Sequence, residues 1–284
     1  MGPEKITVTR RAFTLVELLI VIVIIALLMS IILPSLATAR KQCQASVCRN
    51  NVRQLYIANT GYAIANNDFY VLAARDIFVL DNGKKSRWGG MHRWHGIRQS
   101  DGVSSDPSMN TFDPTNGPLQ SYLNGGEIKE CPGIVTFTKD GRENAFEAGC
   151  GGYGYNSVGV GSRSYQYGYC NRAMRTNMKI TEIEQPAHKI MFADTAFKQG
   201  GGIIEYSFCE PPMFVLDFGH GIQEIPGVQP SIHFRHLSRT NVVWCDGHVT
   251  AESLDFPQEA KGQTEQFKIG WFGPEDNALF RPWN

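Results

Sequence analysis

A long apolar segment, residues 13–33, is the most pronounced feature of the hydropathy pattern of this chain. Its 21 residues would span about 31 Å as an α-helix, close to the thickness of a bilayer's hydrocarbon core. Glu17 is the only charged residue in the segment. A carboxylate near the edge of a spanning helix is unfavourable unless it finds a partner. The pattern therefore predicts a membrane-spanning helix whose carboxylate has a function.

The helical pattern continues beyond the apolar segment. Pro34 removes one backbone hydrogen bond, so we expect the helix to kink or loosen there. Farther on, apolar side chains recur at three- and four-residue steps between polar ones, and Asn66-Asn67-Asp68 marks the end. We predict one helix over residues 13–66, with an amphipathic part over 34–66. Its apolar stripe, interrupted by Asn59, consists of Val47, Cys48, Val52, Leu55 and Tyr62.

The rest of the chain predicts short strands joined by irregular segments. Between residues 69 and 187, glycine, proline, asparagine and serine interrupt most runs. The clearest hairpin joins residues 241–245 to residues 248–252 through Asp246-Gly247, a pair typical of a tight turn with positive φ at both central positions. One long helix followed by a small antiparallel sheet with irregular insertions predicts an α+β fold. Further candidate strands cover residues 71–74, 77–80, 189–193 and 231–234.

The charges of the chain balance overall but not along its length. The sequence has 27 Lys and Arg against 27 Asp and Glu. Residues 1–12 carry Lys5, Arg10 and Arg11 against Glu4, which leaves 24 cations and 26 anions in the remainder, a balance of −2. Basic residues before a spanning helix favour a cytoplasmic N-terminus. The slightly acidic remainder has no basic patch with interleaved aromatic residues, which argues against a nucleic-acid partner.

The residues around the start of the apolar segment resemble a processing signal. The run Arg10-Arg11-Ala12-Phe13-Thr14-Leu15-Val16-Glu17 is similar to the class III signal of type IV prepilins and type II secretion pseudopilins. This resemblance implies that a prepilin peptidase cuts between Ala12 and Phe13 on the cytoplasmic side and that Phe13 is N-methylated. It also implies roles in filament assembly for Glu17 and Pro34. Ala12 departs from the glycine usual before the cut, and slower cleavage is the expected effect.

Two other interpretations of the N-terminus remain open. The first is a secretory signal peptide, because Ala37-Thr38-Ala39 offers an A-x-A cleavage site after the apolar run. The second is a plain membrane anchor. Neither gives Glu17 a role, since the first discards the segment and the second needs only apolar residues. We therefore favour the prepilin interpretation.

Two more segments extend the resemblance to pseudopilin-like proteins. Cys48 begins a C-x-x-N-x-x-Q-L stretch that ends at Leu55, directly behind the signal. Near the C-terminus, nine residues separate His236 from Asp246-Gly247, which matches a motif named H-X9-DG. Since turn chemistry already accounts for Asp246 and Gly247, we expect a structural role for this motif, with His236 bonded to a backbone group.

A metal site is the alternative for this C-terminal region. Calcium is considered because some major pseudopilins bind it in a C-terminal loop, but the oxygen ligands that it needs are few here. Histidine and carboxylate side chains together suit zinc or another divalent metal. We favour the structural role and predict no cofactor. The four residues that would supply metal ligands are His233, His236, Asp246 and His248.

The remaining cysteines and histidines do not outline a site by their spacing. The seven cysteines include no C-x-x-C pair, and we predict a Cys131–Cys150 disulfide around a glycine-rich loop. His92 and His95 lie in another glycine-rich segment without a nearby nucleophile, so we expect a solvated or partner-facing loop. No hydrolase, metalloprotease or phosphate-loop motif occurs. We predict that the protein is not an enzyme.

These predictions divide the chain into a leader (1–12), a transmembrane and assembly helix (13–33) and a pilin-like body (34–284) that includes the H-X9-DG region (231–254). The expected protein is a structural subunit of a type II secretion pseudopilus or type IV pilus-like filament. It would be a single-pass inner-membrane protein with its body in the periplasm or in an extracellular filament. Its partners would be copies of itself, other pilins, prepilin peptidase and the assembly machinery. The alternative is an exported metal- or glycan-binding protein that uses the signal only as an anchor.

Overall fold

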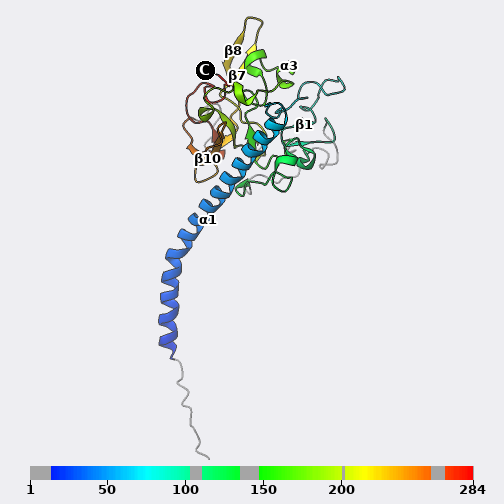
Figure 1. Ribbon diagram of the computed structural model, residues 1–284. Coiled ribbons are helices and arrows are strands. Elements are labelled where there is room, and N and C mark those ends of the chain that lie inside the picture. The colour runs from blue at the N-terminus through cyan, green and yellow to red at the C-terminus, as the bar shows by residue number, and fades with distance from the viewer. Residues whose placement is uncertain (1–13, 103–110, 135–146, 200–201, 257–265, 284) are drawn as a thin grey trace, which may run out of the picture. The chain divides into compact units, whose positions relative to one another are not determined.

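One helix dominates the first part of the molecule. The computed structural model describes residues 14–102, 111–134, 147–199, 202–256 and 266–283. Helix α1 (Leu15–Ala65) runs through Pro34 without a break (Figure 1). The predicted helix over residues 13–66 is therefore confirmed to within two residues at each end. The chain divides into two compact units, Met1–Cys43 and Gln44–Asn284, which are described separately.

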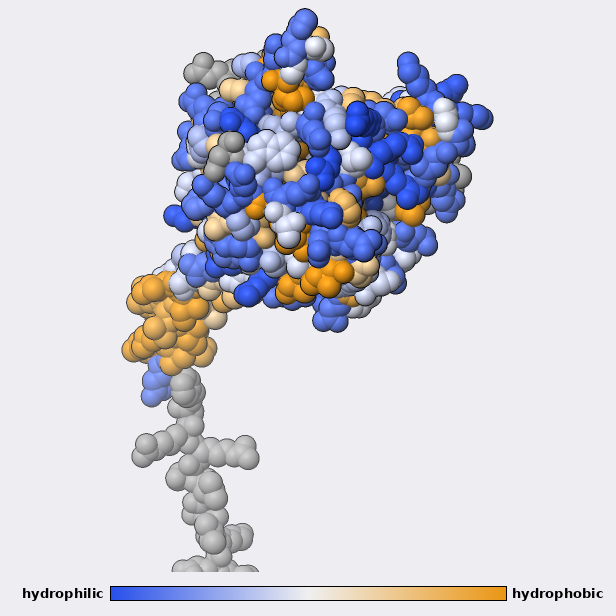
Figure 2. Space-filling model, turned by 45° about the horizontal axis from the view of Figure 1, so that its top comes forward, coloured by the Kyte–Doolittle hydropathy of each residue, from blue (hydrophilic) through white to orange (hydrophobic). Residues whose placement is uncertain are grey.

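In the first unit, the apolar side chains of α1 are exposed. Leu15 is 81% exposed and Ile31 is 74% exposed, and Figure 2 shows apolar residues covering the visible face of this stretch. Among the described residues, α1 is the one helix long and apolar enough to cross a bilayer. The apolar first part of α1 is compatible with a membrane anchor.

In the second unit, α1 contributes a buried stripe. The spacing of the buried positions places them on one face of the helix, and they include the predicted Cys48, Val52 and Leu55, whereas Val47 is exposed. Asn59, the polar exception in the pattern, donates to Tyr155 Oη at 3.1 Å and accepts from the Val71 N–H at 3.0 Å. A buried amide with both groups bonded is compatible with a core position. The buried residues are Cys48, Asn51, Val52, Leu55, Ala58, Asn59 and Ala63.

A four-stranded antiparallel sheet packs against this stripe. Its strand order is β11-β10-β4-β3. Alternate residues of β10 face opposite sides: Val243 joins the core shared with α1, whereas Val242 and Trp244 join a second core that contains Trp271. The sheet is thus a layer between α1 and the C-terminal segment, and the predicted α+β, pilin-like arrangement is confirmed. The strands are β3 (Tyr153–Tyr155), β4 (Ile190–Asp194), β10 (Arg239–Trp244) and β11 (Val249–Ser253).

Short elements surround this sheet. The two-stranded antiparallel pairs are β1 (His92–Arg93) with β2 (Gly96–Ile97), β5 (Phe197–Gln199) with β6 (Gly202–Ile204), β7 (Met213–Asp217) with β8 (Ile222–Pro226), and β9 (Ile232–His233) with β12 (Ile269–Gly270). The short α-helices are α2 (Ser164–Tyr167) and α3 (Asn171–Met174). The 3-10 helices are η2 (Pro114–Asn116), η3 (Gln120–Tyr122), η5 (Ile180–Glu182) and η6 (Pro186–His188).

The strands predicted at residues 71–74 and 77–80 do not form. The Ala73 N–H donates to the Gly161 carbonyl, and the Ala73 carbonyl accepts from the Trp94 N–H. These partners belong to separate segments of the chain. Because no single neighbouring strand supplies them, the segment is buried without a ladder of paired hydrogen bonds.

The segment with His92 and His95, predicted to be a solvated or partner-facing loop, is buried from Arg93 to His95, whereas His92 stays partly exposed. Trp94 and His95 are 0% and 1% exposed. Arg93 forms a bidentate ion pair with buried Glu147, with Nη2 to Oε1 at 2.6 Å and Nε to Oε2 at 2.8 Å. Trp94 Nε1 also donates to the Ser207 carbonyl at 2.7 Å. This ion pair and the large aromatic ring account for the burial of the segment.

Candidate functional site

The described structure begins just after the predicted processing site, so Ala12 and Phe13 lie outside the described residues. At the start of α1, the side chains of Thr14 and Glu17 each accept a hydrogen bond from the backbone N–H of the other residue. The Thr14 N–H donates to Glu17 Oε2 at 2.9 Å, and the Glu17 N–H donates to Thr14 Oγ1 at 3.2 Å. This is a capping box, which bonds helix N–H groups that have no partner within the helix. Sequence reasoning missed this role, although the T-x-x-E spacing indicates it.

Pro34 lies inside α1 and leaves the carbonyl of Ser30 without its usual helical donor. Hydroxyl groups close to Pro34 bond to helix carbonyls. Ser35 Oγ donates to the Ile32 carbonyl at 2.9 Å, and Thr38 Oγ1 donates to the Pro34 carbonyl at 3.2 Å. The helix continues on both sides, so the predicted loosening does not interrupt it.

Asp246 and Gly247 form the loop between β10 and β11. The Gly247 N–H donates to the Trp244 carbonyl at 2.9 Å. Asp246 Oδ1 accepts from the His248 N–H at 3.1 Å and lies 2.6 Å from His248 Nδ1. Gly247 has φ of 91°, but Asp246 does not have positive φ. The turn is confirmed, whereas its predicted two-residue primed geometry is wrong. The Trp244 N–H donates to the His248 carbonyl, which leaves a three-residue loop, Cys245-Asp246-Gly247, with the last residue left-handed.

His236 stands at the start of a different turn. The N–H groups of His236 and Arg239 each donate to the carbonyl of the other residue at 3.0 Å. Leu237 and Ser238, between them, have φ of 54° and 63°. This is the primed two-residue turn of a hairpin, formed here by two residues that have a Cβ. It orients the imidazole of His236 toward a buried group of side chains.

Four potential metal ligands meet at that group, in the core of the second unit. They are Cys48 from α1, Cys131 from a loop, Asp194 at the end of β4, and His236, with all ligand atoms within 4.8 Å of one another and all four residues buried. Cys48 Sγ lies 2.9 Å from Asp194 Oδ1, and His236 Nε2 lies 3.2 Å from Cys131 Sγ. We call these four residues the buried cluster. Within the described ranges it is the only such group, and it does not include the other predicted candidates, His233, Asp246 and His248.

The cysteine pairing predicted from the sequence is therefore wrong. The Cys131 thiol faces His236 and Cys48, whereas the Cys150 thiol lies 3.5 Å from Glu205 Oε2. All seven cysteines are free thiols in the structure. The Cys131 thiol lies near Cys48 of α1, whereas the Cys150 thiol contacts Glu205.

Arg235 holds the buried cluster in place. Its Nη2 lies 3.0 Å from Asp194 Oδ1, and its Nε lies 3.3 Å from Cys131 Sγ. Its Nη1 donates to the Thr195 carbonyl at 3.0 Å. The Asn241 N–H donates to the other oxygen of Asp194 at 2.7 Å. These contacts fix the orientation of the Asp194 carboxylate and compensate part of its buried charge.

Burial and neighbouring charges set the protonation of the two thiols. Burial raises the pKa of Cys48, and the nearby Cys131 and Asp194 raise it further. A hydrogen bond from Cys48 lowers the pKa of Cys131 despite burial, and the Arg235 and His236 side chains lower it as well. Burial also raises the pKa of Asp194, although Arg235 opposes this. These opposite shifts favour the thiolate at Cys131 and the protonated thiol at Cys48.

The geometry is not that of a Cys–His–Asp catalytic triad. In a triad, the carboxylate bonds one ring nitrogen of the histidine while the nucleophile meets the other. Here one atom, His236 Nε2, faces both Cys131 Sγ at 3.2 Å and Asp194 Oδ2 at 3.6 Å. Cys48 and Cys131 are also enclosed, at 0% and 1% exposed. The cluster therefore lacks the arrangement and the access that nucleophilic attack on a substrate requires.

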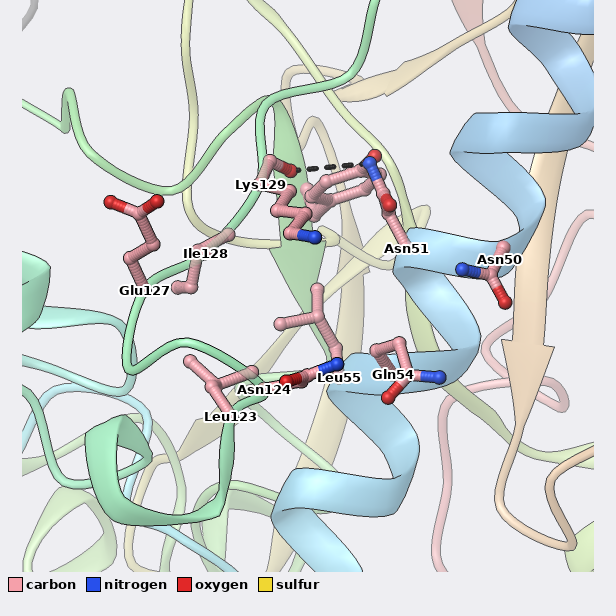
Figure 3. Close-up of a pocket in the computed structure, with 10 residues that line it drawn as sticks. Asn50, Asn51, Gln54, Leu55, Leu123, Asn124, Glu127, Ile128 and Lys129 are labelled. Atoms are coloured by element: carbon pink, nitrogen blue, oxygen red, sulfur yellow. Dashed lines mark hydrogen bonds between the residues drawn. The ribbon is translucent and has the colours of Figure 1, made fainter.

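A polar pocket adjoins the cluster. It lies between α1 and the loop at residues 123–129, and Tyr153 forms part of its lining. Asn51 Nδ2 donates to the Lys129 carbonyl across it at 3.4 Å (Figure 3). The hydroxyl group of Tyr153 lies beside the Cys48 thiol. The other lining residues are Asn50, Gln54, Leu55, Leu123, Asn124, Glu127 and Ile128.

Comparison with known families bears on the N-terminus. Residues 9–33 match the model of the prokaryotic N-terminal methylation motif. The prepilin signal predicted around Ala12 and Phe13 is therefore confirmed. The match covers 25 of the 284 residues and does not reach the body. No curated protein and no solved structure matches the chain.

Proposed function

We propose that this chain, which carries a prepilin-type methylation motif, is the precursor of a structural subunit of a type II secretion pseudopilus or type IV pilus-like filament. The observation that carries the proposal is the continuity of the motif at residues 9–33 with α1, whose apolar side chains are exposed. A prepilin peptidase cuts between Ala12 and Phe13. The mature protein then resides in the inner membrane, with its N-terminus in the cytoplasm, until assembly. Its work is mechanical and not catalytic.

The exposed apolar part of α1 provides the assembly surface. Leu15, Leu27 and Ile31 are 81%, 63% and 74% exposed. Removing one large aliphatic side chain from water is worth about 1.5–3 kcal/mol. This stretch is therefore buried either in lipid or against the same stretch of other copies. Because lipid tails are as apolar as leucine, exchanging one for the other changes the free energy little, which lets subunits leave the bilayer for the filament.

Glu17 supplies a polar contact within this apolar surface. Its carboxylate accepts from the N–H and the hydroxyl of Thr14 at 2.9 and 2.8 Å. A carboxylate has about four acceptor positions, so capping leaves room for a cation. Cleavage before Phe13 creates an α-amino group four residues before Glu17. When parallel helices stack, the amino group of one copy pairs with the Glu17 carboxylate of its neighbour.

Filament incorporation in the native host tests this proposal. Filaments are sheared from cells, separated from membranes and probed for the body of the protein, with and without active prepilin peptidase. We expect the protein in the filament fraction only when the peptidase is active. Ala12→Gly should raise incorporation, whereas the matched variant Ala12→Leu should block cleavage and leave the protein in the membrane. Incorporation that does not depend on cleavage would contradict the proposal.

The buried cluster supports a second candidate, an exported metal-binding protein anchored by the same signal. A cleaved protein that stays in the membrane fraction under conditions where filaments form would favour it. The glycan-binding form of this alternative has less support. Tyr153, Tyr155 and Tyr165, three of the aromatic residues of the body, are buried and cannot stack on a sugar.

A further inference from the structure

We propose that the buried cluster of Cys48, Cys131, Asp194 and His236 is a binding site for a thiophilic divalent cation, with zinc as the expected metal. The site goes beyond the proposed role in a filament and does not depend on it. Four separate segments of the second unit supply one ligand each. Its support comes from the spacing of the ligand atoms, their chemistry, the charge they bring together and the groups around them.

The spacing of the ligand atoms suits a tetrahedral ion. Zinc–sulfur distances of about 2.3 Å and zinc–nitrogen or zinc–oxygen distances of about 2.0–2.2 Å place tetrahedral ligands about 3.3–3.8 Å apart. The observed separations are 2.9 Å from Cys48 to Asp194, 3.2 Å from Cys131 to His236 and 3.6 Å from His236 to Asp194. No pair exceeds 4.8 Å. Shifts of about 1 Å or less would complete the coordination.

The donor set selects the class of metal. Two sulfurs, one imidazole nitrogen and one carboxylate oxygen suit zinc, because thiolate ligands favour soft and borderline cations. Calcium and magnesium require six or more ligands that are mostly oxygen, and the cluster offers one carboxylate. With four protein ligands and no access for a substrate, the site would be structural and not catalytic.

The charges of the metal-bound form balance inside the core. Two thiolates and the Asp194 carboxylate sum to −3, and His236 is neutral as a ligand. A divalent cation contributes +2, and Arg235, which contacts both Asp194 and Cys131, contributes +1. The total is zero. Buried charges persist when they are paired or coordinate a metal, and here both conditions are met.

The surrounding polar groups fit the same form. The Tyr153 hydroxyl is buried beside the Cys48 thiol. A metal-bound thiolate at Cys48 would accept its hydrogen. The Gly133 N–H donates to Cys131 Sγ at 3.4 Å, and the Asn241 N–H donates to Asp194 at 2.7 Å. Metal ligands are characteristically oriented by such outer contacts.

The site would hold the second half of α1 to the sheet. Cys48 lies on the helix, whereas Asp194 ends β4 and His236 begins the turn before β10. Because the ligands converge only in the folded chain, the free energy of metal binding adds to the free energy of folding. Removing the metal should therefore loosen the contact between α1 and the sheet before it affects the outer hairpins.

Metal analysis of the full-length protein tests the site. The protein is extracted in detergent without chelator, and its metal content is measured by mass spectrometry. We expect one zinc per chain, replaceable by Co²⁺ with the absorption of thiolate–cobalt coordination. Cys48→Ser and Asp194→Asn should lose the metal. Cys209→Ser is the matched control, since Cys209 is equally buried but outside the cluster, and it should keep the metal.

One further variant distinguishes the loss of a metal ligand from misfolding of the protein. His236→Cys should still bind Co²⁺, with stronger thiolate–cobalt absorption because a third sulfur is added. The proposal is overturned if the purified protein neither contains zinc nor takes up Zn²⁺ or Co²⁺. It is also overturned if Cys48 and Cys131 form a disulfide in protein taken directly from cells, or if Cys209→Ser loses as much metal as Cys48→Ser.

Discussion

A single methyl group at Gly247 would test how the β10–β11 loop meets α1. Gly247 has φ of 91°, and an added Cβ would lie 2.5 Å from Tyr56 Cε1 and 2.7 Å from Tyr56 Cζ. The backbone strain of a non-glycine residue there costs about 1–3 kcal/mol. Overpacking against the Tyr56 ring adds about 1–3 kcal/mol. We therefore expect Gly247→Ala to lower the free energy of unfolding by about 2–6 kcal/mol.

The matched control is Gly219→Ala. Gly219 has φ of 84°, but nothing lies within 4 Å of the position that its Cβ would take, so only the backbone strain applies. Thermal unfolding of the full-length variants in detergent, followed by tryptophan fluorescence, should show Tm falling by about 2–4 °C for each kcal/mol. Gly247→Ala should therefore melt at least about 2 °C below Gly219→Ala. Asp246→Asn should be mild, because its amide oxygen can still accept from the His248 N–H.

Two results would refute this reasoning. Equal losses of stability at the two glycines would show that Gly247 does not contact Tyr56. A larger loss for Asp246→Asn than for Gly247→Ala, with no further loss on adding chelator, would identify Asp246 as a metal ligand and not a turn residue. The buried cluster predicts that chelator lowers the Tm of Asp246→Asn as much as that of the wild type.

Three more predictions concern other buried or capped groups. Glu17→Gln keeps an oxygen that can accept from the Thr14 N–H but loses the negative charge. Cleavage and membrane insertion should therefore be normal, whereas filament assembly should be impaired. Efficient assembly in the shearing assay would show that Glu17 pairs with no cation. Arg93→Leu should lower the free energy of unfolding by about 3–5 kcal/mol, because Glu147 stays buried without its cation. In denaturant titrations, adding Glu147→Leu should restore much of this loss. No recovery would show that Arg93 and Glu147 do not act as a pair. Burial, followed by the charge of Arg93, lowers the pKa of His95 well below its usual range. Below about pH 6.5, His95 is therefore protonated in the unfolded chain but stays neutral in the folded chain. Stability should therefore fall as the pH drops below about 6.5, and His95→Phe should flatten this slope; an unchanged slope would show that His95 is not responsible.

The sequence was sufficient where neighbouring residues encode the structure. The apolar run and the stripe behind it predicted α1 almost to its ends, and the runs on either side of Asp246-Gly247 predicted β10 and β11. Segment 71–74 was different. Its short apolar run resembles a strand, but its backbone groups bond to Asn59, Gly161 and Trp94, which are far apart in the sequence. Such tertiary partners leave no local pattern.

The buried cluster could not be predicted because its ligands are far apart along the chain. Intervals of 83, 63 and 42 residues separate Cys48, Cys131, Asp194 and His236. Asp194 ends a buried strand without any motif around it. Proximity in sequence instead suggested Asp246 as the partner of His236. The turn at Leu237-Ser238, which aims His236 at the cluster, contains neither glycine nor asparagine and so gave no turn signal.

The mass and N-terminal sequence of the mature protein test prepilin processing most directly. The protein is extracted from membranes with detergent and examined by intact-mass and peptide mass spectrometry. The account predicts a chain that begins at Phe13, contains 272 residues (284 minus 12) and carries a methyl group on its α-amino nitrogen. A mature chain that begins at Arg40, after Ala37-Thr38-Ala39, would contradict it, because the exposed apolar part of α1 that the proposal assigns to filament assembly would then have been discarded.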